Sequence, residues 1–246
     1  MRDTFHSFCI RLSPLMASFP RLTFSSDRFD ALLCLDGSLP ANPDFYSHFS
    51  SLPIIAADGA AVQLQHLGIT PAYIIGDLDS FHSIAKDTDF PNSSILYVPD
   101  QETNDFEKCL IYCQSAGFQS VLVCGFHGGL LEHSLNNWSV YIRYSEILNL
   151  CIYESMRYIL SIRESLEFQA SLQEIISLIP QPEARLTTQG LQWSLTNEWL
   201  RLGTREGARN RVIAVPIQID IHEGSLLFIC DARLPYKPIV AHHPNS

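Results

Sequence analysis

Three acidic motifs in this chain each follow an apolar segment or open a predicted helix, and this arrangement constrains the fold more than any other feature. Asp58-Gly59 follows residues 52–57, Asp77 and Asp79 follow residues 72–75, and a third acidic segment occupies residues 100–108. In a parallel α/β sheet such positions lie at the carboxyl ends of the strands, which form the edge where ligands bind. Carboxylates that meet there can hold a hard cation such as Mg²⁺, the usual partner of a polyphosphate. The pattern therefore predicts metal-assisted chemistry on a phosphorylated substrate.

The first half of the chain predicts an α/β domain over residues 29–156. Apolar strands alternate with helices, and this alternation is typical of a parallel, Rossmann-like sheet covered on both faces. The expected strands are 31–35, 52–57, 72–75, Ser120–Cys124 and 148–153, and the expected helices are 59–67, 103–116 and Leu131–Tyr144. Thr103 is the expected cap of the second helix.

The second half predicts an all-β sandwich over residues 160–235, because short β-rich segments separated by turn residues replace the helical pattern. The expected strands are 158–160, 165–170, 174–178, 185–188, 191–195, 211–219 and 225–230. We expect the boundary between Glu154 and Glu164, a leader over residues 1–28 that is disordered or partly ordered, and a frayed tail after Pro235.

Composition excludes several classes of protein. A net charge of −10 argues against a nucleic-acid partner, which demands a basic surface. No run approaches the roughly 20 apolar residues of a membrane helix. The seven cysteines form no C-x-x-C pair, which favours reduced thiols in a cytoplasmic protein over a disulfide framework or a zinc site. Residues 1–23 only faintly resemble a transit peptide.

Each motif also has an ordinary structural interpretation. Asp77-x-Asp79 alone could be a turn with a helix cap, and Asp105 lies in a first helical turn, where acids are favoured whatever the function. The glycine-rich segment 125–129 could be a plain loop, and His133 a structural histidine. The order of the motifs on successive strand ends is what favours a functional site.

That order resembles the thiamine pyrophosphokinase family. The family carries D-G-G-A, P-x-x-(I/F)-x-G-D-x-D-S, D-Q-x-x-T-D-F-x-K, G-G-R-x-D-H-x-x-x-N and T-x-G-L-x-W-x-L, the last followed by a Ser-Asn pair. The matching segments here are 58–61, 71–80, 100–108, 128–137 and 188–195, with Asn210 at the second place of the pair. The resemblance covers residues 31–230, and five motifs in order make it specific.

The resemblance implies a reaction in which ATP and thiamine give thiamine diphosphate and AMP, with Mg²⁺ as cofactor. It implies a homodimer in which each active site lies between one subunit's α/β domain and the other's β-domain. The implied metal ligands are Asp77, Asp79 and Asp105, and Asp58 joins them as a catalytic residue. The implied ATP-binding residues are Asp58, Gln101, Thr103, Lys108, Gly128, Gly129, His133 and Asn137, and the implied thiamine-binding residues are Trp193, Arg209 and Asn210.

The chain also departs from the family pattern. Leu130 replaces an arginine, Val62-Gln63 replaces a frequent Asn-Arg, and Arg209 replaces the serine of the Ser-Asn pair. Two smaller departures are Asn104 in place of threonine and Glu132 in place of aspartate. The lost guanidinium groups are phosphate clamps whose geometry a lysine cannot copy. Arg209 either restores one positive charge or obstructs thiamine.

Two rival functions remain at this point. A phosphatase of the haloacid dehalogenase type also uses D-x-D at a strand end, with the first aspartate as nucleophile. The second rival is a catalytically weakened protein that binds thiamine or nucleotide and acts as a sensor.

Overall fold

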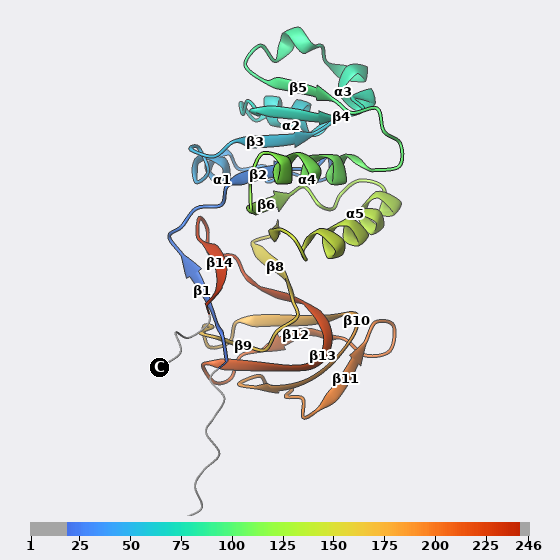
Figure 1. Ribbon diagram of the computed structural model, residues 1–246. Coiled ribbons are helices and arrows are strands. Elements are labelled where there is room, and N and C mark those ends of the chain that lie inside the picture. Colours follow the sequence, from blue (N-terminus) through green and yellow to red (C-terminus); the bar gives the residue numbers. More distant parts are fainter. Residues whose placement is uncertain (1–18, 242–246) are drawn as a thin grey trace, which may run out of the picture.

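The computed structural model describes residues 19–241 as two stacked lobes, an α/β lobe and a β-rich lobe (Figure 1). Most of the leader expected over residues 1–28 therefore lies outside the described residues. No helix between residues 19 and 241 is long and apolar enough to span a bilayer.

The α/β lobe is built on six parallel strands in the order β5-β4-β3-β2-β6-β7. These strands are β2 (Ala31–Cys34), β3 (Ile54–Ala57), β4 (Tyr73–Gly76), β5 (Ser94–Tyr97), β6 (Ser120–Cys124) and β7 (Asn149–Glu154). The helices are α1 (Pro43–Ser47), α2 (Ala60–His66), α3 (Asp79–Ile84), the 3₁₀ turn η1 (Asp87–Asp89), α4 (Asp105–Ser115) and α5 (Leu131–Tyr144). The predicted parallel sheet is confirmed, whereas β5, α1 and α3 were not predicted.

Alternating side chains of the sheet feed two separate cores. Leu32 packs in the core that includes residues of α1, α2 and α3, whereas its neighbour Leu33 packs in the core that includes residues of α4 and α5. Both side chains are fully buried. Because both faces of a strand such as β2 are covered, its sequence reads as a continuous apolar run rather than an alternating one.

The β-rich lobe contains β1 (Arg21–Ser25), β8 (Arg157–Ile162), β9 (Leu166–Phe168), β10 (Ile175–Gln189), β11 (Glu198–Arg201), β12 (Gly207–Arg211), β13 (Ile217–Asp231) and β14 (Lys237–Ala241). Its pairings are antiparallel except for β1 with β9. The expected antiparallel β architecture is confirmed, but the element bounds differ from the prediction. Two expected strands merge into the 15-residue β10, and β13 runs unbroken through residues 220–224, where a break was expected. Residues 191–195 form no strand and contribute only the isolated bridge between Leu191 and Val212.

The prediction that the chain frays after Pro235 is wrong. β14 pairs antiparallel with β1, so that Arg21 lies opposite Ala241 and Ser25 opposite Lys237. This pairing also orders the end of the expected leader. It joins segments more than 200 residues apart, which no local sequence pattern reveals.

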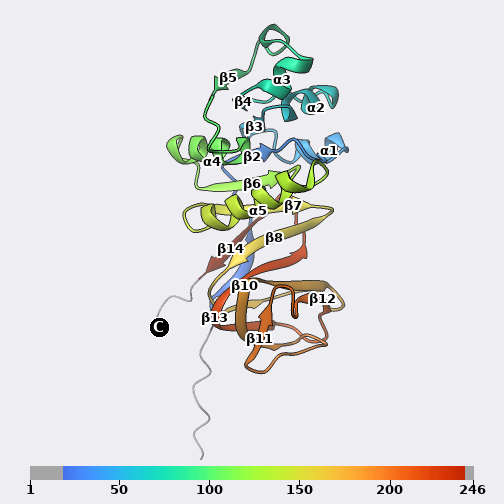
Figure 2. The same ribbon diagram turned by 90° about the vertical axis from the view of Figure 1, so that its right-hand side faces the viewer.

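The two lobes share one sheet. β7 turns into β8 through Ser155 and Met156, which both have positive φ angles, of 50° and 64°. Two consecutive positive φ angles are typical of a two-residue hairpin turn that matches the twist of its strands. β8 then pairs with β13, so the hydrogen-bonded network continues from one lobe into the other (Figure 2).

Candidate active site

Three carboxylates gather at the carboxyl edge of the parallel sheet. Asp58 follows β3, Asp77 follows β4, and Asp105 begins α4. Each offers an oxygen atom, and these atoms all lie within 4.8 Å of one another. The structure therefore brings together Asp58, Asp77 and Asp105 of the four expected acids, whereas Asp79 lies outside the group.

Asp58 is held rigidly. It has a left-handed backbone (φ 44°) and is 5% exposed. Its two carboxylate oxygens accept hydrogen bonds from the backbone N–H groups of Ser80 and Phe81, at 3.2 and 3.0 Å. These N–H groups belong to the first turn of α3, whose own N-cap residue has no side-chain bond. Asp58 therefore both ties β3 to α3 and presents charge to the site.

Asp77 is oriented from three directions. Its carboxylate accepts the backbone N–H of Asp79 at 3.3 Å and the side-chain amide of Gln101 at 3.2 Å. The ammonium group of Lys108 lies 3.5 Å away. Partial burial opposes ionisation, but these three interactions outweigh it and hold the pKa of Asp77 below its ordinary value. Asp77 is therefore a stable carboxylate at neutral pH.

Lys108 is the buried cation of the group. Its side chain is 2% exposed, and its Nζ lies 3.0 Å from Asp105 and 3.5 Å from Asp77. Burial lowers the pKa of Lys108, but the two carboxylates outweigh this effect and raise it. Burial raises the pKa of Asp105, and the charges of Asp58 and Asp77 add to the rise, against the opposing effect of Lys108. A neighbouring divalent cation would relieve this repulsion.

Asp79 lies outside the group. The residue before it, Leu78, has a left-handed backbone (φ 63°) and a buried side chain. This turn starts α3 at Asp79 and leaves Asp79 exposed. The D-x-D spacing shows that two carboxylates are close in sequence, but the buried leucine between them determines which one joins the group.

The three carboxylates fit Mg²⁺. All donors are oxygens, as a hard cation prefers, and octahedral ligands at about 2.1 Å are separated by about 3 to 4 Å. Oxygen atoms within 4.8 Å of one another lie close to that spacing. Asp77, Asp105 and Asp58 could therefore hold the ion.

A pocket of about 500 Å³ opens beside the carboxylates. It is lined by the expected residues Asp58, Gln101, Thr103, Lys108, Gly129, His133 and Asn137, together with Asp77 and Asp105. Gly128 does not line it. A Cβ at Gly128 would come within 1.9 Å of the Ser38 hydroxyl, so this glycine allows a close approach of two loops.

Asn104 joins the third motif to the glycine-rich segment. It caps α4 by accepting the N–H of Glu107 at 2.9 Å, and its amide donates to Asn137 at 2.9 Å. The expected cap Thr103 instead donates its hydroxyl to Asp100 at 2.5 Å. The substitution of asparagine at position 104 therefore has a structural role, because it braces α4 against α5.

Asp36 is a lining residue that the sequence analysis did not assign to the site. It follows β2, and its carboxylate accepts the amide of Gln63 at 2.7 Å. Burial raises the pKa of Asp36, opposed by the Gln63 hydrogen bond. A Cβ at Gly59 would lie 2.5 Å from its carboxylate, which accounts for the glycine there. The strand end at Asp36-Gly37 was the available signal.

The three residues expected on the thiamine side do not line this pocket but lie together in the β-rich lobe. Asn210 is buried and holds both backbone groups of Trp193, accepting its N–H at 3.1 Å and donating to its carbonyl at 2.8 Å. Trp193 is 60% exposed. Arg209 is also exposed and adjoins Asn210 in β12. These residues form a second, separate surface on the same chain.

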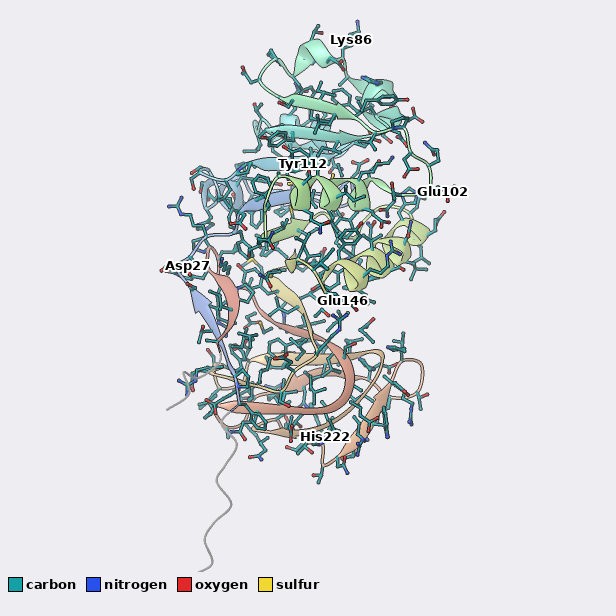
Figure 3. All side chains as sticks on the ribbon, in the orientation of Figure 1. Asp27, Lys86, Glu102, Tyr112, Glu146 and His222 are labelled. Atoms are coloured by element: carbon teal, nitrogen blue, oxygen red, sulfur yellow. The ribbon has the colours of Figure 1, made fainter. Side chains whose placement is uncertain are left out.

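The pocket carries an excess of negative charge. Glu102, whose label marks the loop before α4, and Glu132 line it with the other acids (Figure 3). The lining includes six acidic residues and one lysine. Because Lys108 is already paired with two of the acids, no lysine or arginine among the lining residues is left for an anionic substrate.

Comparisons with known proteins agree with this geometry. The family model "Thiamin pyrophosphokinase, catalytic domain" matches residues 49–152, and "Thiamin pyrophosphokinase, vitamin B1 binding domain" matches residues 158–226. Thiamine pyrophosphokinase 1 of Arabidopsis thaliana is 28% identical, covering 94% of this chain and 89% of the relative. Thiamin pyrophosphokinase 1 of Caenorhabditis elegans is 25% identical over 71% of this chain and 76% of its own.

Solved structures share the fold. The yeast thiamin pyrophosphokinase structure superposes with a TM-score of 0.68 at 20% identity, covering 84% of this chain and 87% of the other. That of thiamine pyrophosphokinase from Bacillus subtilis gives 0.67 at 19% identity, covering 83% and 100%. The two family models cover the carboxylate edge and most of the β-rich lobe in the same order as the sequence motifs. The chain belongs to the thiamine pyrophosphokinase family.

Proposed function

We propose that this chain transfers a diphosphate group from ATP to the hydroxyl of thiamine, which gives thiamine diphosphate and AMP. The thiamine oxygen attacks the β-phosphorus, and the bond from that phosphorus to the oxygen of AMP breaks. The observation that carries the proposal is the group Asp58, Asp77 and Asp105 at the sheet edge of a chain matched by catalytic and vitamin B1 binding family models.

Mg²⁺ is the proposed cofactor, held by Asp77 and Asp105 with Asp58. When bound, the ion supplies positive charge to the triphosphate and helps to align it. Asp79, which is exposed and lies outside this group, is not a proposed ligand. Gln101 and Lys108 keep Asp77 and Asp105 oriented, as their distances of 3.2, 3.5 and 3.0 Å support.

ATP is proposed to occupy the pocket beside these carboxylates. The backbone of Gly129 and the side chains of Thr103, His133 and Asn137 would contact the nucleotide, because all four residues line the cavity. Gly128 does not line it and would instead allow the close approach of its loop to Ser38. The hydrogen bond between Asn104 and Asn137 supports a fixed position for Asn137.

Thiamine is proposed to bind between two copies of the chain in a homodimer. Support comes from the separation of the two surfaces, since Trp193, Arg209 and Asn210 are absent from the lining of their own chain's pocket. The indole of Trp193 is exposed, and the buried amide of Asn210 fixes its backbone. Such an indole can stack against the flat ring of an organic substrate. Sedimentation that shows only monomer at tens of micromolar would contradict the dimer.

A cytoplasmic location is part of the proposal. Its support is the state of the cysteines: the six between residues 19 and 241 are free and buried. Two of them, Cys34 and Cys124, approach to 3.5 Å between sulfur atoms without being joined. Reduced thiols of this kind are typical of a reducing compartment.

One assay separates this function from its rivals. ATP, thiamine and Mg²⁺ are mixed with the chain, and AMP and inorganic phosphate are measured. AMP release that requires thiamine supports the proposal. Inorganic phosphate without thiamine would indicate a phosphohydrolase, and binding without either product would indicate a sensor.

A further inference from the structure

The nucleotide pocket lacks a free cation for the phosphates. Its one lysine, Lys108, is 2% exposed and is engaged by Asp105 and Asp77. Six acidic residues line the same cavity. A polyphosphate carries several negative charges, and a metal ion bound by three carboxylates has much of its own charge already neutralised. The phosphates therefore need a cation from outside this pocket.

Arg209 is a cation without a partner. Its guanidinium group makes no hydrogen bond, ion pair or ring contact with any residue between 19 and 241. Each of the other ten arginines in that part of the chain has a hydrogen-bond or ion-pair partner on the chain. A guanidinium group is suited to bidentate recognition of phosphate.

The backbone at Arg209 is strained and fixed in place. Arg209 has a φ angle of 56°, which is uncommon for a residue with a Cβ. Between the pairs Ile176–Asn210 and Leu178–Gly207, β12 has two residues where β10 has one, so Arg209 lies in a β-bulge. Its N–H donates to the hydroxyl of Ser177 at 2.9 Å. Bulges and strained backbones of this kind often direct a side chain to a functional site.

Exposed apolar side chains occur near both the pocket and Arg209. Leu131 and Leu135 lie one turn apart on α5, whose first turns line the pocket, and they are 71% and 60% exposed. Beside Arg209, Trp193 is 60% exposed. Two exposed leucines therefore lie on the helix that lines the acidic pocket, and an exposed tryptophan is bonded to the residue that follows Arg209.

We propose that Arg209 of a second copy of the chain enters the pocket and binds the phosphate oxygens of the nucleotide. The active site is then incomplete in one chain, and two copies complete each other's sites. This inference rests on the proposed function for the identity of the nucleotide, and it deepens that function by assigning the phosphate cation to one residue in trans.

The first test measures nucleotide affinity. Arg209→Ser should weaken the binding of Mg²⁺–ATP by about 10- to 150-fold, the loss of a charge-assisted hydrogen bond. Arg209→Lys should give an intermediate loss of affinity, because lysine keeps the positive charge but cannot form the two parallel hydrogen bonds of a guanidinium group. Arg211→Ser is the matched control. It removes the same charge at a position two residues from Arg209, and the side chain of Arg211 bonds only the neutral Gln173. It should change affinity by about twofold or less.

The second test asks which chain supplies the arginine. A chain carrying Asp77→Asn and a chain carrying Arg209→Ser are co-expressed with different tags, and mixed dimers are purified. In trans, one site of each mixed dimer pairs an intact Asp77 with an intact Arg209. We expect one high-affinity Mg²⁺–ATP site per mixed dimer and about half of the wild-type AMP release.

Three results would overturn the inference. The first is an Arg209→Ser variant that binds Mg²⁺–ATP as tightly as the wild type does, whether or not it binds thiamine more tightly. The second is a mixed dimer no better than its parents, and the third is a chain that stays monomeric with ATP bound. Failure of the proposed function has a different signature: the affinities follow Arg209 as expected, but the wild type releases no AMP with thiamine.

Discussion

Replacing Lys108 by methionine tests whether the site is held together by charge. The change keeps a long apolar stem but removes the ammonium group that lies 3.0 Å from Asp105 and 3.5 Å from Asp77. At an effective dielectric constant of about 20, these distances correspond to gross attractions of about 5 kcal/mol each. The cost of burying the ammonium group offsets several kcal/mol of this. Because Asp77 and Asp105 are 23% and 31% exposed, solvent screens much of the remainder.

We therefore expect Lys108→Met to lower the free energy of unfolding by about 2–3 kcal/mol when a chelator removes divalent cations. For a domain of this size the loss corresponds to a fall in Tm of about 4–12 °C. The rise in Tm on adding Mg²⁺ should be larger for the variant than for the wild type. The reason is that the ion no longer competes with a fixed positive charge for the same carboxylates.

The assay is thermal unfolding of both chains, with a chelator and across a MgCl₂ titration. Lys86→Met is the control, because Lys86 is exposed at the far end of the α/β lobe, and its Tm should not change (Figure 3). The reasoning is refuted if Lys108→Met matches the wild type in chelator, or if Mg²⁺ raises its Tm by less than it raises that of the wild type.

Three further predictions use the same protein. Asp79→Asn should keep the Mg²⁺-dependent rise in Tm, whereas Asp58→Asn should lose most of it; equal losses would return Asp79 to the metal group. Leu130→Arg, made in the Arg209→Ser chain, should restore most of the lost ATP affinity in calorimetric titrations, because residue 130 directly precedes α5 beside the pocket; an unchanged affinity would argue against a missing cation. Burial opposes ionisation of Glu174, but the hydrogen bonds that it accepts from an arginine and two backbone N–H groups outweigh it and lower its pKa. Its stabilisation is therefore present above about pH 4.5 and is lost as the pH falls further, so Glu174→Gln should flatten the acid limb of urea-unfolding stability, and an unaltered limb would contradict this.

The sequence predicted the carboxylate edge because the rule involved is local. An acid directly after an apolar strand lies at the carboxyl end of that strand, and parallel strands bring their carboxyl ends together. Asp58 and Asp77 followed from this rule, whereas the resemblance to the family implied Asp105, because acids are favoured in a first helical turn whatever the function. The parallel sheet and its longer helices, including α5, were predictable for the same reason, since each is written in a short stretch of periodic sequence.

What the sequence missed depends on contacts between distant segments. Asp79 is exposed because the buried Leu78 takes a left-handed conformation, which no propensity predicts. Trp193 is held by the amide of Asn210, 17 residues away. β13 continues across the mostly polar residues 220–224 because β10 pairs with four of these five residues. In each case the partner, rather than the local pattern, determines the outcome.

The continuous sheet limits how this molecule can move. β8 pairs with β7 through four residue pairs and with β13 through six, so a hinge rotation between the lobes would have to break one of these ladders. Many two-lobed transferases close over their substrates by such a rotation. Here the pairing of β8 with both lobes opposes that motion, so substrate entry and product exit fall to the surface loops. In the proposed homodimer, turnover at low protein concentration should reflect association kinetics as well as chemistry.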